Sequence, residues 1–429
     1  RICPCPPRLD TLTQDTASIG DLSWWELYND TTLQQLIHRA LTYNKDLKIA
    51  SARMNELAAL KRIDFANMFP QATARLNGNR ETTNYGGDNF DADPELSLTA
   101  SISWELDLWG NLRWARDHST AEFLASVENC RAVKIGLVAQ VAQSYFELMA
   151  LDNELAIVRR TLEARREGVR LAEIRFKGGL TSEIVFQQAK VELAKTATMV
   201  PDLERRISLK ESEIALLTGD FPYAVNRNVL PEEIQLPDAL PLGLPSTLLE
   251  RRPDIRKAER ELMAAHAEVG LAYTNMFPRL ALTATLGAES ETLRDLLKSP
   301  YSYLAGNLLS PLFAMGKNRA ALKAKRTAYE SAVAEYEKTV LTAFKETHNA
   351  IINFNKIKDI YESRRQLAEA SRTAVELAQL QYINGVIGYL DLLDAQRNYF
   401  DAQVSLSNAV CDKQLMIINL YKALGGGWK

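Results

Sequence analysis

The sequence lacks any uninterrupted run of about 18 apolar residues, the length that a membrane-spanning helix needs. It also lacks an excess of charge of either sign. The formal net charge is −3, and no terminus or face concentrates Lys and Arg without compensating Asp and Glu. The first absence excludes a helical membrane protein, and the second predicts no nucleic-acid partner. If this chain crosses a membrane, it must do so with strands.

Groups that could carry out chemistry are also scarce. The histidines are His38, His118, His266 and His348. None has a second His or Cys at metal-ligand spacing, and each is expected on a helix surface or in a helix seam. Phosphate-binding loops are missing too, because the glycines at 178–179 and 425–427 lack the required spacing and the strand-to-helix setting. These absences predict a protein that is not an enzyme and uses no metal or cofactor.

Cysteine is rare, and its positions divide into two kinds. Cys130 and Cys411 fall inside helical patterns, where a small buried thiol is expected. Cys3 and Cys5 lie near the first residue and are followed by a polar tether rich in Thr, Asp and Ser. This arrangement predicts that Cys3 or Cys5 is the acylated anchor of a lipoprotein, with an unmodified N-terminus as the alternative.

An amphipathic helix is predicted near the start of the chain. Asp30 or Thr31 can serve as its N-cap, and apolar side chains recur at helical spacing from Leu33 to Leu41. The helix is expected to continue to residue 68, because Phe69-Pro70 ends it.

A change of hydrophobic period then predicts strands. Alternation begins at 72–76 and, after a loop at 78–94, runs without an error through 97–108. The second run exceeds the ~9–11 residues that a tilted strand needs to cross a bilayer. Trp104 and Trp109 lie near one end of it, as aromatic residues at a membrane interface would. A half-buried strand of a soluble sheet would show the same alternation.

A very long helix is predicted for residues 111–177, which contain no proline. Its heptad seam, from 137 to 176, is apolar except at Ser144 and Arg165. At about 1.5 Å per residue this helix is about 100 Å long, too long for the core of an ordinary domain. Gly178 and Gly179 end it.

A second helix is then predicted to start at Thr181 or Ser182 and to run towards Leu217, with a kink or join at Pro201. The two helices therefore form a hairpin.

The second half of the chain repeats the first. Gly110, Gly179 and Gly219 recur 206 positions later as Gly316, Gly385 and Gly425. Strands are expected again, at 280–286 and 301–313. A constant offset across helices, strands and turns predicts an internal duplication. The predicted divisions are a tether at 1–30, a first repeat at 31–219, an equatorial linker at 220–247, a second repeat at 248–425 and a tail at 426–429.

The number of strands limits how the chain can enter a membrane. Two strands per repeat give four per chain, and a membrane barrel needs about eight or more. An open sheet in lipid would leave the N–H and C=O groups of its edges without partners. Strands that cross a membrane must therefore be pooled by several chains.

Four segments resemble one family. PLGLPSTLLERRPDIRKAE at 241–259 is similar to the signature of TolC-like outer-membrane efflux proteins, in particular the lipoprotein branch that serves resistance-nodulation-division pumps. WWELYNDTTLQQLI, ELDLWGNLR and YLDLLDAQR are similar to the same branch at matching places. The resemblance implies a mainly α-helical, internally duplicated chain that forms a homotrimer. Its twelve-stranded β-barrel would lie in the lipid of a Gram-negative outer membrane and continue into a periplasmic α-helical barrel. The implied partners are a periplasmic adaptor and an inner-membrane pump.

The hairpin tip at 382–397 is the candidate functional site. Asn384 and Gly385 break a helix there, as Gly178 and Gly179 do in the first half. The next helix begins with a leucine and three charges: Leu390, Asp391, Asp394 and Arg397. By themselves, these charges favour a solvated helix start. The resemblance implies instead a periplasmic gate, in which Leu390, Asp394 and Arg397 narrow the tube as an apolar ring and a charged ring held by links between helices. Arg397 or hydrogen bonds would hold the three copies of Asp394. Asp391 departs from the family pattern.

The function implied is therefore a passive exit duct for efflux, driven by its pump. Two alternatives differ in class. One is the outer-membrane component of a polypeptide secretion system, which would share the fold. The other is a periplasmic coiled-coil scaffold without a pore.

Overall fold

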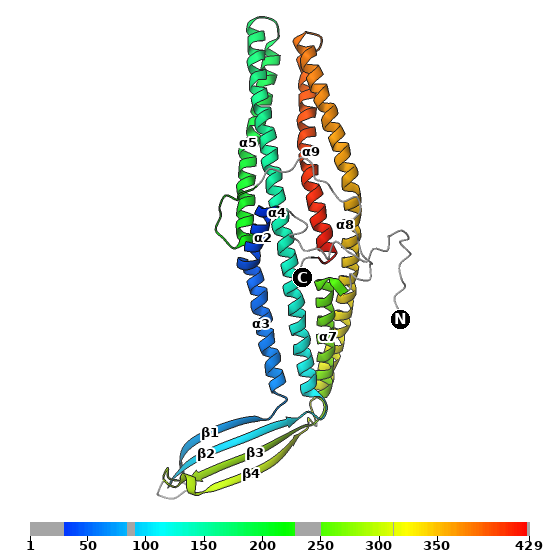
Figure 1. The fold of residues 1–429 in the computed structure, drawn as a ribbon. Coiled ribbons are helices and arrows are strands. Elements are labelled where there is room, and N and C mark those ends of the chain that lie inside the picture. Colours follow the sequence, from blue (N-terminus) through cyan, green and yellow to red (C-terminus); the bar gives the residue numbers. More distant parts are fainter. Residues whose placement is uncertain (1–29, 84–90, 228–249, 312, 427–429) are drawn as a thin grey trace, which may run out of the picture. The chain divides into compact units, whose positions relative to one another are not determined.

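A computed structural model describes residues 30–83, 91–227, 250–311 and 313–426 (Figure 1). In chain order, the elements are α2 (Thr31–Tyr43), α3 (Lys45–Ala66), β1 (Gln71–Thr83), β2 (Asp91–Leu106), α4 (Asn111–Lys177), α5 (Glu183–Thr218), α7 (Pro253–Thr274), β3 (Arg279–Ser290), the 3-10 turn η2 (Leu296–Lys298), β4 (Pro300–Leu309), α8 (Lys317–Ile383) and α9 (Tyr389–Ala423). None of the helices within these ranges is long and apolar enough to span a membrane.

The two halves of the chain have the same order of long helices. Helices α4 and α8 each contain 67 residues and begin 206 positions apart. The turns that follow them match as well, since Gly179 and Gly385 both adopt positive φ, at 73° and 75°. The predicted repeat boundaries stay a prediction, because the chain divides instead into two compact units that each draw on both halves.

The first compact unit, here the hairpin unit, comprises residues 1–50, 130–253 and 340–429 where they are described. It contains the α4–α5 and α8–α9 hairpins (Figure 1). Its core is a continuous apolar cluster in which Val141, Tyr145 and Leu148 of α4 are fully buried together with Leu203 and Ile214 of α5. The three residues of α4 recur every three or four positions, as expected for helices that pack along a heptad seam.

The first helical segment is interrupted, where a single helix was predicted. Asp30 is the N-cap of α2 and accepts hydrogen bonds from the amides of Thr32 and Leu33. At Asn44, however, α2 ends and α3 begins. The buried Asn44 side chain accepts from the Leu47 amide (2.9 Å) and donates to the Leu217 carbonyl (2.9 Å). It therefore caps α3 and also ties this break to the end of α5.

The strand boundaries correct the prediction at three places. Strand β1 continues to Thr83 and β2 begins at Asp91, so most of the loop predicted at 78–94 is strand. β2 ends at Leu106 and β4 ends at Leu309, earlier than alternation suggested.

Helix α5 is continuous through Pro201, so no join occurs there.

The second unit, here the sheet unit, comprises residues 51–129 and 254–339 where they are described. Its four strands form one antiparallel sheet in the order β1-β2-β3-β4, so β1 and β4 are the edges. In this register Ala100 is opposite Ala74 and Leu286, and Ile102 is opposite Ala72 and Ala284. One face of the sheet is therefore apolar across the strands.

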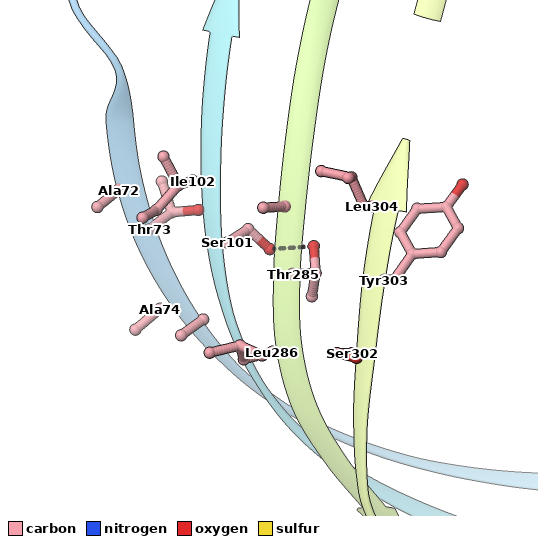
Figure 2. Close-up of a pocket in the computed structure, with 12 residues that line it drawn as sticks. Ala72, Thr73, Ala74, Ser101, Ile102, Thr285, Leu286, Ser302, Tyr303 and Leu304 are labelled. Atoms are coloured by element: carbon pink, nitrogen blue, oxygen red, sulfur yellow. Dashed lines mark hydrogen bonds between the residues drawn. The ribbon is translucent and has the colours of Figure 1, made fainter. Parts of the chain in front are cut away.

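The opposite face is polar. Ser101 is paired with Thr73 and Thr285 in the neighbouring strands, and its hydroxyl lies 2.9 Å from that of Thr285. Figure 2 shows this hydroxyl pair, with Leu286 and Ile102 beside it on the same two strands. The sheet thus separates an apolar face from a polar one along its length.

Helices α4 and α7 pack closely within the sheet unit. A Cβ at Gly270 would lie 2.3 Å from Cδ2 of Trp114, so only glycine allows this approach. The Trp114 ring meets the edge of His266, which in turn meets Tyr329 of α8. An ion pair between Arg256 and the buried Glu128 (2.8 Å) joins α7 to α4.

Candidate functional site

The two hairpin tips share one backbone design. At the first tip, the Leu180 amide donates to the Arg175 carbonyl (2.8 Å), and the Gly179 amide donates to Phe176 (2.9 Å). This pattern around a left-handed glycine is a Schellman motif, which satisfies the last carbonyls of α4. Thr181 lies outside α5, and Ser182 is its N-cap without a side-chain hydrogen bond.

The second tip uses the same motif. The Val386 amide donates to Gln381 (2.9 Å), the Gly385 amide donates to Tyr382 (3.1 Å), and the Asn384 side chain adds a bond to the Leu380 carbonyl (2.8 Å). The predicted break residues Asn384 and Gly385 therefore lie at the turn, as Gly178 and Gly179 do in the first tip.

The four predicted gate residues have different surroundings. Leu390 is 61% exposed. Asp394 is exposed as well and accepts a hydrogen bond from Asn398 (3.3 Å). Asp391 turns back to accept from the Gly388 amide (3.1 Å), so it caps α9. Arg397 reaches a different hairpin altogether.

Arg397 forms an ion pair with Glu192 of α5, and its Nε also lies 3.2 Å from Glu192 Oε1. The Glu192 side chain is only 4% exposed, while that of Arg397 is 47% exposed. Glu192 is held from its other side by Arg165 of α4, whose Nη1 lies 2.9 Å from Glu192 Oε2. One buried carboxylate thus joins the α4–α5 hairpin to the α8–α9 hairpin. Arg165, Glu192 and Arg397 are called the tip cluster below.

The tip cluster is enclosed by further contacts. Arg165 also donates to the Glu192 carbonyl (2.9 Å) and to the Thr196 hydroxyl, and its guanidinium lies over the Phe400 ring. Nearer the turns, Arg175 of α4 lies 4.7 Å from the centre of the Tyr382 ring of α8. The two hairpins are therefore linked at two levels near their tips.

Charge and burial set the protonation of the tip cluster. Burial acts to raise the pKa of Glu192, but the hydrogen bond from Arg397 and the charges of Arg165 and Arg397 outweigh it and lower that pKa. The same hydrogen bond raises the pKa of Arg397. Burial lowers the pKa of Arg165, and Glu192 offsets part of this effect. The ion pairs are thus favoured over their neutral forms.

The tip cluster should weaken in acid. Because the pKa of Glu192 is below its ordinary value of 4.5, the ion pairs are complete above that value and are lost as pH falls through the lowered pKa. Arg165 and Arg397 stay charged throughout. If the pairs restrain the tip, the conductance of the protein in planar bilayers should rise when pH is lowered from about 5 to about 3.

Glu192→Gln serves as the control for this pH dependence, because its side chain does not titrate. The variant should conduct more than the wild type at neutral pH and show little further rise in acid. A rise in acid that is equally large in Glu192→Gln would assign the pH dependence to other carboxylates.

Arg165 and Glu192 were not predicted as site residues, although the sequence pattern indicates both. Arg165 is one of two polar residues in the heptad seam of α4, and each binds a glutamate of α5: Arg165 binds Glu192, and Ser144 donates to Glu213 (3.0 Å). Glu192 itself belongs to a seam in α5 at 189, 192, 196, 203 and 207, where every residue is buried. A charged residue in each of two facing seams indicates a buried ion pair.

Other predicted residues lie elsewhere. Trp104 and Trp109 are exposed in the sheet unit and donate to the carbonyls of Met68 (3.0 Å) and Pro278 (2.8 Å). Cys411 is buried, which raises its pKa to about 12, whereas Cys130 is only half-buried. Cys3 and Cys5 lie outside the described residues. Within those residues, no group of three or more His, Cys, Asp and Glu side chains could hold a metal ion.

The family of outer membrane efflux proteins matches residues 36–220 and 244–426, most of the chain. The chain belongs to the outer membrane efflux protein family. Its membership confirms the predicted efflux function, the outer-membrane location and the mainly helical fold class with a strand part.

Individual relatives agree with the family. The efflux protein is 33% identical over 412 residues to the solvent efflux pump outer membrane protein SrpC of Pseudomonas putida, covering 94% of this chain and 87% of that one. It is 29% identical to the probable outer membrane lipoprotein SilC of Salmonella typhimurium, covering 98% and 91%. Among solved structures, the outer-membrane channel OprN matches with a TM-score of 0.89 at 31% identity, covering 96% and 94%. The efflux interpretation therefore fits better than polypeptide secretion or a scaffold without a pore.

Proposed function

We propose that this efflux protein is the passive exit duct of a tripartite pump, closed at its hairpin tips until the adaptor and the inner-membrane pump engage. The proposal of a duct rests on one observation: the four-stranded sheet has an apolar face, a polar face and two edge strands. In lipid such a sheet needs further strands at both edges, and the polar face then lines a lumen.

A homotrimer supplies those strands. Three copies of a four-stranded sheet give twelve strands, enough to close a barrel. The hairpin unit has the matching surfaces: α8 exposes Leu341, Ile352, Leu367 and Leu377, and α5 exposes Ile184, Val191, Leu209 and Leu216. These stripes lie on different helices, so α8 of one copy can pack on α5 of the next. Such head-to-tail contacts close into a ring.

The partners are inferred from the passive nature of the proposed duct and from its family. The family is one of transport channels, and efflux against a gradient requires energy from elsewhere. An inner-membrane pump supplies it, and a periplasmic adaptor couples the pump to the hairpin tips. Cys3 or Cys5 carries the lipid anchor of the tether, as the lipoprotein relative supports.

The gate consists of an opening and a restraint. Leu390 and Asp394 are exposed on α9 and line the opening, where three copies of Asp394 surround the axis and favour cations. The tip cluster is the restraint, because it holds α9 to the neighbouring hairpin. Asp391 caps its own helix and contributes to the shape of the tip rather than to the opening.

Single-channel recording in planar bilayers tests this function. The purified protein should run at about three times its 48.1 kDa chain mass and form small, cation-selective channels. Asp394→Asn should reduce the cation preference severalfold, because it removes the ring of charge without a change in size. Asp412→Asn, a half-buried acid further along α9 that pairs with Arg364, is the control. Bilayers that stay silent with the wild type would refute the duct, and unchanged selectivity in Asp394→Asn would refute the ring.

A further inference from the structure

Exposed aromatic side chains gather in the sheet unit where strands and helices meet. Each lies within a few residues of such a junction, and all are exposed: Phe65, Phe69, Trp104, Trp109, Tyr273 and Phe313. Aromatic residues of this kind mark the interface between the apolar core of a membrane and water. With the sheet inserted as proposed above, helix α8 would therefore begin at the level of the lipid headgroups.

The start of α8 is strongly basic, contrary to the even mixing of charges inferred from the sequence. Lys317, Arg319, Lys323, Lys325 and Arg326 fall within ten residues, and the first acidic residue of the helix is Glu330. Lys325 pairs with Glu268 (2.7 Å). The other four are exposed, and none forms an ion pair within the described part of the chain. Arg319, Lys323 and Arg326 share one helical face, here the basic face of α8.

These cations lie where a helix disfavours them. The N-terminal end of a helix carries partial positive charge, so acidic residues are usual in its first turn. The first turn of α8 contains none. The site thus holds unneutralised positive charge from both side chains and backbone, which an external anion would stabilise.

The matching helix α4 supplies its own anion. Asp107 accepts hydrogen bonds from the amides of Leu112 and Arg113 (both 3.0 Å) and forms an ion pair with the Arg113 guanidinium (3.0 Å). Asp117 then pairs with Arg116 (2.7 Å). With the offset of 206 that relates α4 to α8, Arg113 corresponds to Arg319.

The two acids at the start of α4, Asp107 just before the helix and Asp117 within it, have no equivalent at the start of α8. At the same offset, the position of Asp107 is taken by Phe313 and that of Asp117 by Lys323. Phe313 is 84% exposed, and Met315 beside it is 85% exposed with a positive φ of 45°. The second junction has therefore exchanged two carboxylates for an apolar side chain and a further cation.

We propose that the basic face of α8 binds anionic glycerophospholipid in the periplasmic leaflet of the outer membrane. This inference rests on the proposed insertion of the sheet in that membrane. The lipid phosphate takes the place that Asp107 holds at the start of α4, with Arg319 and Lys323 as its partners, and Phe313 and Met315 contact the acyl chains. At about 1.5 Å per residue, Arg326 lies only about 14 Å along the helix from its start. Its long side chain can therefore reach back to the headgroups.

Lipid binding to the detergent-solubilised trimer, followed by native mass spectrometry, tests the proposal. Phosphatidylglycerol and phosphatidylcholine are added separately to the wild type and to the variant Arg319→Gln/Lys323→Gln/Arg326→Gln. Each cation near an anionic headgroup contributes about fivefold to binding. We therefore expect the wild type to prefer phosphatidylglycerol and the triple variant to lose at least tenfold of that preference.

Two further variants make the result specific. Lys338→Gln/Lys345→Gln/Lys356→Gln removes as many cations from more distant positions of α8 and should keep the preference. Phe313→Asp/Lys323→Asp restores the acids of the first half and should abolish the preference even though Arg319 and Arg326 remain.

Several results would overturn the proposal. One is an unchanged preference in the triple variant, and another is an equal loss in the distant control. A third is dissociation of the triple variant into single chains, which would assign the basic face to contacts between copies. A wild type that conducts in bilayers but does not distinguish the two lipids would contradict this inference and leave the duct intact. A wild type that conducts in no bilayer would contradict the proposed function itself.

Discussion

Arg397→Ala is expected to raise the mean conductance of the channel, averaged over its closed and open states, about tenfold. The substitution removes the contact between α9 and Glu192 of the neighbouring hairpin. A charge-assisted hydrogen bond contributes about 1.5–3 kcal/mol, and the 47% exposure of Arg397 reduces this to about 1–2 kcal/mol. Because about 1.4 kcal/mol is a factor of ten in an equilibrium, the open population rises by that order. Single-channel recording at neutral pH measures the change.

Matched variants separate this restraint from a general effect of charge. Glu192→Gln keeps the size of the side chain and should give a similar rise, while the double variant should add little to either single one. Arg372→Ala removes an arginine of α8 whose ion pair with Glu376 lies on the surface, and it should leave conductance unchanged. Additive effects of Arg397→Ala and Glu192→Gln would show that the two side chains act separately.

The tip cluster is built so that only one of its contacts is easily broken. Glu192 is buried and keeps Arg165, which is 9% exposed, whether or not Arg397 is present. Water can reach Arg397, so its departure does not leave an unpaired charge in the interior. In the proposed gate, an adaptor that competes for Arg397 or displaces α9 would therefore release the second hairpin while the first stays intact.

The sequence predicted the long elements well because their patterns are repetitive. Helix α4 begins and ends where the predicted helix 111–177 does, and both tips lie at the predicted glycines. A seam of several heptads and a left-handed glycine leave few alternatives. Boundaries set by a single side chain were missed, as at Asn44, where one amide group caps a helix and binds a residue that is distant in the sequence.

The candidate site was predicted only in part, because its central residue pairs across the two hairpins. Arg397 was expected to act near Asp394, which is three residues away on the same helix. Its partner in the structure is Glu192, 205 positions earlier. The first hairpin supplies both Arg165 and Glu192. Local spacing cannot show which surface a long side chain reaches when two hairpins fold side by side.

The segment 241–259 that carried the family resemblance contains the residue with the largest expected effect on stability. The Arg252 side chain is 8% exposed and donates to the Ala423 carbonyl at the end of α9 (3.2 Å) and to Glu346 of α8 (2.6 Å). Gly425 adopts a positive φ against it, so that a Cβ there would lie 3.2 Å from Arg252 Cγ. Arg252 thus joins the start of α7 to two other helices.

Arg252→Met is therefore expected to destabilise the protein by about 1–3 kcal/mol, because methionine fills similar space and leaves the Ala423 carbonyl and Glu346 without this donor. Thr347 also donates to the Ala423 carbonyl (3.2 Å), so the effect stays below that of a wholly unpaired group. Thermal unfolding of the purified protein in detergent measures the change as a lower midpoint. Arg53→Met removes an exposed ion pair with Glu56 and should shift the midpoint little. Equal midpoints for Arg252→Met and the wild type would mean that packing of the apolar seams alone fixes the end of α9.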